Sequence, residues 1–388
     1  MEAIKKLMER VNNTKLSIEE RYPEINATQD GRKNILFISP MLNKQGLYRM
    51  ILPALELAVD IDGVVRYNTI INQILPEDHT KIVDDFHIKI VPELIRWADY
   101  MVFPANGLDL TSVIKSFKDI NPKVKVVMDV DRNYHALNQN NYTAKKFTVD
   151  KQRNLEKNLR LVDFSTYPDF VTKDFYEKKV GLPIKTFILP NLLSPYQFDF
   201  DKNVERIKPK DGKRRILLMA DADDYDDINS FRDTINEVMI RVPDSKVYVL
   251  GNGYVYETKN PLRFVNYTKA EYKDLLDYYQ VIWNMNPDLA IIPIKKQAFH
   301  RTYYKILELA AFNIPMVSMN EYPYNHLLKK DIHILLNGQK KTFVTSVKTA
   351  MDSASIRADL AKHCHNYVTN KFSFLNNEFI ASYLKAFL

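Results

Sequence analysis

The chain has 388 residues, 46% of them hydrophobic, and a formal net charge of +7, which predicts two or three domains at roughly 150 residues each. Its one cysteine, Cys364, excludes a disulfide framework and favours a reducing, cytoplasmic compartment. No run of the sequence approaches the roughly 18 consecutive apolar residues of a transmembrane segment. The positive net charge favours binding of anionic partners, or it simply reflects a solvated, lysine-rich surface.

The first 30 residues predict an amphipathic helix followed by a linker. Ile4, Leu7, Met8 and Val11 recur at helical spacing and form an apolar stripe. Such a helix would dock on a partner or form a homodimer, or it would be a plain N-terminal extension.

The next part of the chain alternates short apolar runs with amphipathic segments. Strands are expected at 34–39, 64–71, 100–104, 124–129, 163–166 and 186–189, and helices at 48–59, 92–98, 112–121, 146–161 and 165–180. Strands that alternate with helices of roughly 10–15 residues predict parallel βαβ units. Right-handed crossovers then place helices on both faces of the sheet.

A polar segment at 195–213, with Pro195, Pro209 and Gly212, is the best linker candidate. The same rhythm restarts after it, with strands expected at 215–220, 245–251, 262–266, 289–293 and 316–318 and helices at 228–241, 269–282, 303–312, 339–368 and 376–388. The sequence therefore predicts an α/β protein with two Rossmann-like, doubly wound parallel-sheet domains that face a central cleft. The expected bounds are 1–30 for the N-terminal helix and linker, 31–200 and 201–372 for the domains, and 373–388 for a last helix.

Residues 287–320 are the most informative stretch. A strand is followed by a loop that carries Lys295 and Arg301, and then by a helix that carries Lys305 and Glu308 one turn apart. The N-terminus of a helix stabilises an anion by about 0.3–1 kcal/mol. The segment therefore predicts a phosphate site, with Glu308 placed to accept hydrogen bonds from a ribose diol. The alternative is that Lys305 and Glu308 pair with each other on the helix surface.

The pattern P-D-L-A-I-I-P-I…K-x-x-E-x-A-x-x-x-x-P-x-V in this stretch resembles the donor site of retaining GT-B glycosyltransferases of the large family 4 type. Further stretches resemble the same family in the expected order, namely 34–54, 127–131, 162–166, 188–191 and 247–253. The resemblance extends over residues 33–375 and rests on the order and spacing of these motifs together.

The resemblance implies transfer of a sugar from a nucleotide-sugar donor to an acceptor, with retention and without a metal or other cofactor. It assigns the acceptor to the domain at 31–200 and the donor to the domain at 201–372. The implied donor-binding residues are Gly251, Asn252, Lys295, His300, Arg301, Thr302, Lys305 and Glu308. The implied catalytic candidates are Asp131, His135 and Glu308, and Tyr48 and Arg49 are candidates for a phosphate or acceptor contact. Arg49 would otherwise lie over the surface of its helix.

The sequence departs from the family pattern at several positions. His300 replaces the first of two glutamates spaced eight positions apart. Residues 220–227 are acidic where many relatives carry Arg and Lys, and an acidic loop would repel a diphosphate. Asn313 replaces a glycine, and asparagine also adopts the left-handed conformation.

Three alternatives stay open. One is a phage-type enzyme that glycosylates a hydroxylated base in DNA within a host cytoplasm, so that the partner is a modified DNA base rather than a glycan. It would bind phosphates through a basic face built from Lys115, Lys118, Lys123, Lys145, Lys146 and Arg153. Another is a degenerate, non-catalytic GT-B binding or scaffold protein. The third is a single-domain GT-A enzyme in which Asp129 and Asp131 hold a divalent metal.

Overall fold

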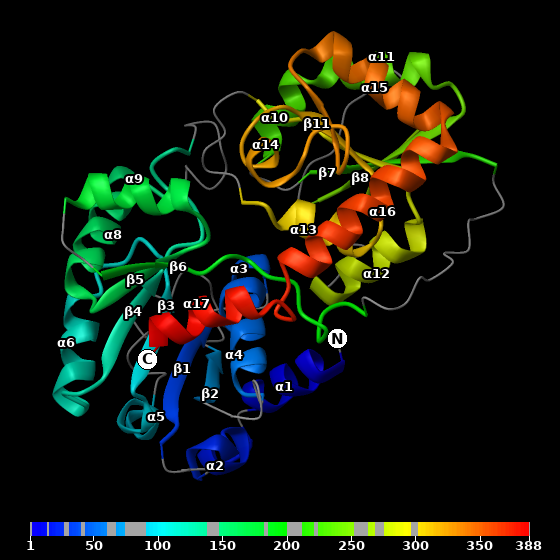
Figure 1. Cartoon of the computed structure of the whole chain (residues 1–388). Coiled ribbons are helices and arrows are strands. Elements are labelled where there is room, and N and C mark those ends of the chain that lie inside the picture. Colours follow the sequence, from blue (N-terminus) through cyan, green and yellow to red (C-terminus); the bar gives the residue numbers. More distant parts are fainter. Residues whose placement is uncertain are drawn as a thin grey trace. The chain divides into compact units, whose positions relative to one another are not determined.

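The computed structural model describes residues 2–13, 15–26, 31–39, 43–59, 67–73, 91–137, 147–181, 185–199, 212–220, 224–251, 263–267, 275–295 and 302–387. The chain forms two compact units (Figure 1). Unit 1 comprises Met1–Asn133, Phe147–Asp199 and Phe374–Leu388, and unit 2 comprises Tyr134–Lys146 and Phe200–Ser373. The domain bounds suggested by the sequence stay predictions.

Unit 1 is built on a six-stranded sheet in the order β2-β1-β3-β4-β5-β6, and every pairing is parallel. Its strands are β1 (Lys33–Ser39), β2 (Tyr67–Gln73), β3 (Tyr100–Pro104), β4 (Lys125–Asp129), β5 (Phe164–Tyr167) and β6 (Lys185–Ile188). All five residues of β3 are buried, as expected for a strand that is covered on both faces of its sheet.

The helices of unit 1 surround this sheet. They are α1 (Glu2–Asn12), α2 (Ile18–Arg21), η1 (Pro23–Asn26), α3 (Lys44–Gly46), η2 (Leu47–Ile51), α4 (Leu52–Leu57), α5 (Pro92–Trp97), α6 (Thr111–Ile120), α8 (Val149–Leu161), α9 (Phe170–Val180) and α17 (Asn377–Phe387). The last of these, α17, packs its Phe387 edge-on against Tyr100 of β3 and Phe164 of β5. The C-terminal segment therefore contributes to the core of unit 1.

The helix expected at 48–59 is two segments with a wide π-helical turn, η2, ahead of α4. Pro53 explains the change, because proline has no N–H to donate and its ring clashes with the carbonyl four residues earlier. The N–H of Leu52 donates to the carbonyl of Leu47, five residues back. Such turns are common near functional sites, and this one contains Arg49.

The apolar stripe of the N-terminal helix is used within the unit. Ile4, Met8 and Val11 are buried, and α1 lies against β2. The stripe is therefore accounted for by packing in its own unit, so the apolar residues that suggested docking or homodimerisation do not support it. A homodimer through this helix stays a prediction.

Unit 2 contains the second six-stranded parallel sheet, in the order β12-β11-β10-β7-β8-β9. Its strands are β7 (Arg214–Met219), β8 (Ser245–Leu250), β9 (Phe264–Tyr267), β10 (Leu289–Ile292), β11 (Met316–Met319) and β12 (Leu335–Asn337). This is the Rossmann order, in which the chain reverses direction across the sheet between β7 and β10. The expected two doubly wound sheets are thus confirmed, and the single-domain GT-A alternative is wrong.

The helices of unit 2 are α10 (Tyr225–Ser230), α11 (Arg232–Arg241), α12 (Leu275–Met285), α13 (Tyr304–Ala311), α14 (Tyr324–Leu327), α15 (Lys340–Asp352) and α16 (Ala354–Lys371). Two expected helices are interrupted: the one at 228–241 breaks at Phe231, and the one at 339–368 breaks at Ser353. Ser353 accepts the N–H of Ile356 through its side chain and caps α16. Among the described helices, none is both long and apolar enough to span a membrane.

Candidate functional site

The expected donor site lies at the carboxyl ends of β7, β8 and β10. Parallel sheets of this type bind ligands where the strand order reverses, and in unit 2 that point is between β7 and β10. β7 ends at Met219, β8 ends at Leu250 with Gly251 after it, and β10 leads into Lys295. The helix after β10, α13, begins at Tyr304. The strand order therefore brings the ends of three distant segments to one edge of the sheet.

Lys305, in the first turn of α13, reaches across to the end of β7. Its ammonium donates to the carbonyl of Met219 at 3.0 Å and forms an ion pair with the carboxylate of Asp224. The side chains of Lys305 and Asp224 are 12% and 8% exposed. The ammonium therefore lies at the switch point, and a small part of its side chain is accessible to solvent.

The acidic segment near 220–227 has a defined structural role. Asp224 pairs with Lys305, and Asp227 accepts the backbone N–H of Lys295 at 2.9 Å. Both carboxylates are buried. The sequence predicted an acidic loop that repels a diphosphate, and these contacts offset part of that charge. Residues 221–223 lie outside the described part of the chain.

Glu308 is fully buried one turn along α13 from Lys305. Its carboxylate accepts the hydroxyl of Tyr279, from α12, at 3.0 Å. The alternative of a surface ion pair between Lys305 and Glu308 is wrong, because Glu308 is not at the surface and Lys305 pairs with Asp224.

The other expected donor residues fall into two groups. Gly251 is buried at the end of β8, Thr302 is half-buried just before α13, and the side chain of Lys295 is exposed. Asn252, His300 and Arg301 lie outside the described residues.

Asn313, after α13, has φ 54° and therefore adopts the left-handed conformation expected for its position.

The carboxyl edge of the first sheet holds a buried ion pair between Arg49 and Asp129. The guanidinium donates twice to the carboxylate, from Nη2 at 2.5 Å and from Nε at 2.9 Å. Its Nη1 donates to the carbonyl of Leu189 and to the side chain of Asn191. The alternative that Arg49 lies over the helix surface is wrong, because only 3% of the residue is exposed. Its expected contact with a phosphate stays a prediction that these contacts do not support.

Two further groups interact with this pair. Thr166 of β5 donates its hydroxyl to Asp129 at 2.5 Å. Tyr383 of α17 is buried, and this burial raises the pKa of its phenol above the ordinary value, while the positive charge of Arg49 lowers it. The pair therefore links β4, β5, the segment that follows β6 and the turn η2.

Asp131 and Tyr48 also belong to unit 1. Asp131 is fully buried and accepts hydrogen bonds from Gln45 Nε2 and from Arg132 Nε, both at 3.0 Å. Tyr48 is fully buried, and its hydroxyl accepts a hydrogen bond from Gln197 at 2.9 Å. His135 is half-buried, and it belongs to unit 2 rather than to unit 1.

The idea that Asp129 and Asp131 together hold a metal is not supported by these contacts. The two carboxylates take their hydrogen bonds from different donors, Asp129 from Arg49 and Asp131 from Gln45. Within the described residues, no group of three His, Cys, Asp or Glu side chains is arranged to hold an ion.

Several contributors were not identified from the sequence. They are Asp224, Asp227, Tyr279, Thr166 and Gln45. The only sequence signal for the first two was the acidic cluster itself. Thr166 ends the family-like stretch 162–166, but that resemblance gave its hydroxyl no role. Tyr279 and Gln45 belong to no pattern that separates them from core or surface residues.

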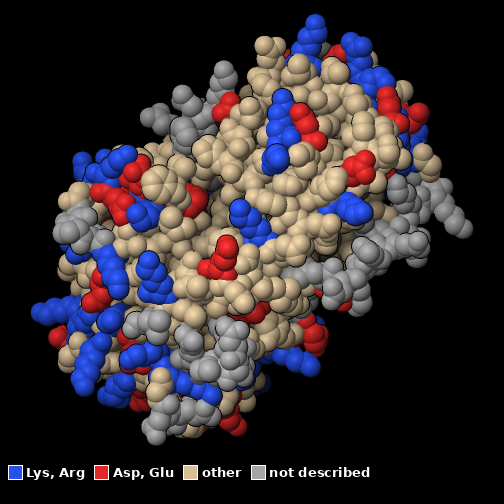
Figure 2. All heavy atoms as spheres, in the orientation of Figure 1, with Lys and Arg blue, Asp and Glu red and all other residues tan. Residues whose placement is uncertain are grey.

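The basic residues considered for DNA binding are partly neutralised. Lys118 pairs with Asp163 at 2.8 Å, and Arg153 pairs with Asp150 at 3.3 Å. Lys115 and Lys123 are exposed. Lys145 and Lys146 lie outside the described residues. Figure 2 shows basic and acidic side chains interspersed on the face that it draws, rather than one basic field.

Comparison with known proteins gives a match in structure only. No protein-family model matches the sequence, and a search of curated proteins found no match. Sucrose-phosphate synthase from Thermosynechococcus elongatus matches with a TM-score of 0.63 and 11% identity, over 92% of this chain and all (100%) of that one. Anabaena HepE, in complex with UDP and glucose, matches with a TM-score of 0.56 and 12% identity, over 92% and 100%.

A mutant of S. aureus TarM, in a complex that includes UDP, matches with a TM-score of 0.53 and 10% identity, over 76% of this chain. The match spans 58% of the length of TarM. These neighbours are GT-B glycosyltransferases, and at such identities they show the fold. The chain therefore has the GT-B fold.

Proposed function

We propose that this chain is a glycosyltransferase that moves a sugar from a nucleotide-sugar donor to an acceptor. The observation that carries the proposal is the ammonium of Lys305 at the switch point of the second sheet, 3.0 Å from the carbonyl that ends β7. The fold is shared with Anabaena HepE, whose complexes contain UDP-glucose or UDP and glucose. A UDP-sugar is therefore the first donor to test.

In this proposal the diphosphate lies at the N-terminus of α13. The helix dipole contributes about 0.3–1 kcal/mol there, and Lys305 exchanges the carboxylate of Asp224 for a phosphate. The exposed ammonium of Lys295 adds charge. Because Glu308 is fully buried and one of its oxygens accepts the hydroxyl of Tyr279, contact with the donor ribose requires a local rearrangement around Glu308.

The finer parts of the proposal are retention at the anomeric carbon and independence of metal. They rest on the K-x-x-E pattern of residues 305–308. Charge that develops on the leaving diphosphate would be stabilised by a cation and by helix amides that are already in place. Asp131 and His135 are proposed to contact the transferred sugar or the acceptor, and a glycan is the acceptor to test first.

The proposal is tested by turnover with UDP-glucose and other nucleotide sugars, followed through nucleotide release. We expect the wild type to release nucleotide, and to continue to do so in excess chelator. The anomeric configuration of the product, read by NMR, should be the same as that of the donor. Lys305→Met should abolish nucleotide release, while Lys348→Met, which removes an exposed lysine of α15, should leave it unchanged. Release that is unaffected by Lys305→Met would contradict the site. Binding without any release over the donor panel would favour the non-catalytic alternative, and salt-sensitive transfer to DNA would identify the acceptor as a modified base.

A further inference from the structure

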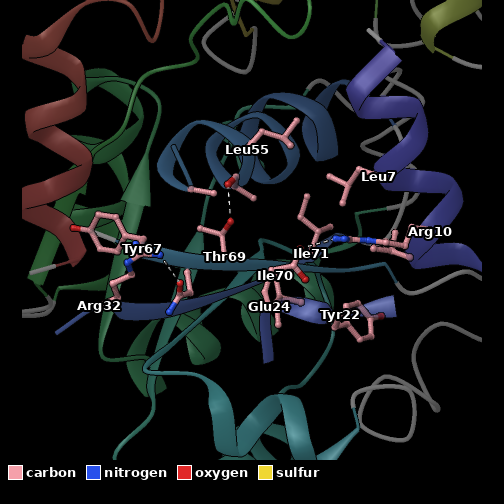
Figure 3. A pocket seen from close by; sticks show the side chains of 14 residues that line it. Leu7, Arg10, Tyr22, Glu24, Arg32, Leu55, Tyr67, Thr69, Ile70 and Ile71 are labelled. Atoms are coloured by element: carbon pink, nitrogen blue, oxygen red, sulfur yellow. Dashed lines mark hydrogen bonds and ion pairs between the residues drawn. The ribbon is translucent and has the colours of Figure 1, made fainter. Parts of the chain in front are cut away.

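A cavity of about 270 Å³ lies in unit 1 between α1, α4 and β2 (Figure 3). Its lining takes Tyr67 to Ile71 from β2, the edge strand of the first sheet. These residues are the first five of the seven in β2, whereas donor and acceptor sites are expected beyond the carboxyl ends of strands. None of the residues assigned above to donor or acceptor lines it. The cavity is therefore a separate candidate site.

The walls of the cavity are largely apolar. Leu7 and Val11 of α1, Leu55 and Ala58 at the end of α4, and Ile71 of β2 contribute aliphatic side chains. Leu55 is half-buried and Ala58 is exposed, so the cavity opens to solvent near the end of α4. At roughly 30 Å³ per water molecule, its volume corresponds to about nine waters. That is room for a short acyl chain rather than a whole lipid.

The charges at the two ends of the cavity differ. Figure 3 shows Arg10 with Glu24 at one end and Arg32 at the other. Arg10 pairs with Glu24 at 2.6 Å. Within the described residues, Arg32 makes one hydrogen bond, a long one of 3.4 Å to Asn68, and it pairs with no carboxylate. An anionic group is therefore repelled by Glu24 at the first end and attracted by Arg32 at the second.

At the end that holds Arg10 and Glu24, two polar atoms lack hydrogen-bond partners among the described residues. Arg10 Nε and Glu24 Oε2 are buried, and neither has a hydrogen-bond partner in the described part of the chain. Buried polar atoms normally have partners. An adjacent buried donor and acceptor suit a water molecule or a small polar substituent of a ligand.

We infer that this cavity binds a small amphiphilic carboxylate, with the carboxylate on Arg32 and the apolar chain against α1 and α4. A guanidinium presents a planar fork of donors that matches a carboxylate. Apolar pockets with a few placed polar groups are the usual form of small-molecule sites. The ligand stabilises the packing of α1 against the sheet, because its chain contacts both.

The test is isothermal titration calorimetry of the full chain with octanoate, and with octanol as an uncharged probe of the same length. Octanoate should bind saturably at one site and more tightly than octanol. Arg32→Gln should weaken octanoate binding by about tenfold or more, as expected for loss of a charge-assisted hydrogen bond. Ala58→Phe, at an exposed position, should weaken both probes by blocking the opening.

The matched control is Lys33→Gln, which removes an exposed charge next in sequence to Arg32 and outside the cavity lining. It should leave both affinities unchanged, and circular dichroism should show that all three variants are folded. Octanol binding as tightly as octanoate, or octanoate affinity that is equal in wild type, Arg32→Gln and Ala58→Phe, would overturn the inference. None of these residues belongs to the proposed donor site, so a failed donor assay leaves this result unaffected.

Discussion

A largely buried cation–carboxylate pair that joins distant segments lies at the carboxyl edge of each sheet, but the two pairs differ in accessibility. In unit 1 the side chains of Arg49 and Asp129 are 1% and 3% exposed, and the guanidinium is held by the carboxylate, a carbonyl and an amide oxygen. In unit 2 the side chains of Lys305 and Asp224 are 12% and 8% exposed. A positive charge at the edge of a parallel sheet is therefore not by itself a sign of a ligand site.

The nature of each cation fits the difference. Arginine forms a rigid bidentate pair with a carboxylate, whereas lysine is a compact point charge on a flexible stem. The Arg49 pair links η2 to β4 and to the segment after β6, and this suits a structural role. In the proposed function, Lys305 exchanges the carboxylate of Asp224 for a diphosphate, and Asp224 precedes α10 rather than belonging to a strand. Under the proposed function, the first pair has a structural role and the second binds the donor.

The largest expected effect is on stability in unit 1. Arg49→Met leaves Asp129 buried without its cation, and breaking a buried pair in this way costs about 3–5 kcal/mol. Scanning calorimetry should show a lower transition for the unit that contains the change. The same substitution at Arg153, whose side chain is 74% exposed in its pair with Asp150, should change stability by less than about 1 kcal/mol.

A double variant sharpens this prediction. Arg49→Met with Asp129→Leu removes both charges, and replacing a buried ion pair with apolar groups is often neutral. The double variant should therefore be more stable than Arg49→Met alone. If Arg49→Met were as mild as Arg153→Met, the structural role of the first pair would be disproved.

The second effect is on ligand binding in unit 2. Lys305→Met should cost about 1–3 kcal/mol of stability, because Asp224 loses its cation, and it should weaken UDP binding by tenfold or more. Calorimetric titration with UDP measures the second quantity. Arg49→Met should keep the UDP affinity of wild type wherever unit 2 stays folded, and a common loss in both variants would contradict the division of roles.

A smaller effect is expected at the buried Glu308. Tyr279→Phe removes the hydroxyl that donates to its carboxylate at 3.0 Å. One lost hydrogen bond costs about 0.5–1.5 kcal/mol, and rearrangement of Glu308 can offset part of this. Urea unfolding of unit 2 measures the cost. A variant as stable as wild type would show that the contact with Tyr279 is dispensable.

The smallest effect belongs to a surface carboxylate. Hydrogen bonds from Lys157 and Thr111 lower the pKa of Asp109 to about 2. Because the folded pKa is depressed, the stabilisation is present above the unfolded pKa of about 3.9 and is lost as the pH falls towards 2. The side chain is 47% exposed, so its share is below about 1 kcal/mol. Urea unfolding of Asp109→Asn and wild type should differ slightly at pH 7 and converge below pH 4. A constant difference would contradict the lowered pKa.

The sequence was sufficient for most of the fold because buried parallel strands appear as short apolar runs. It was not sufficient for β12, which has three residues, or for the π turn, since proline near a helix start is compatible with an ordinary helix. The place of Lys305 followed from its spacing after β10. Its partner Asp224 did not, because 81 positions separate the two and only the strand order joins them.

The central claim is that the donor binds at the switch point of the second sheet. Hydrogen–deuterium exchange of the wild type with and without UDP tests this directly, because a bound ligand slows exchange of the amides that it covers or stabilises. The account predicts protection in peptides that contain the end of β7, Gly251 and the start of α13, with clearly weaker protection in Lys305→Met at a UDP concentration near the Kd of the wild type. Protection confined to peptides of unit 1, or the same protection in Lys305→Met, would contradict the claim.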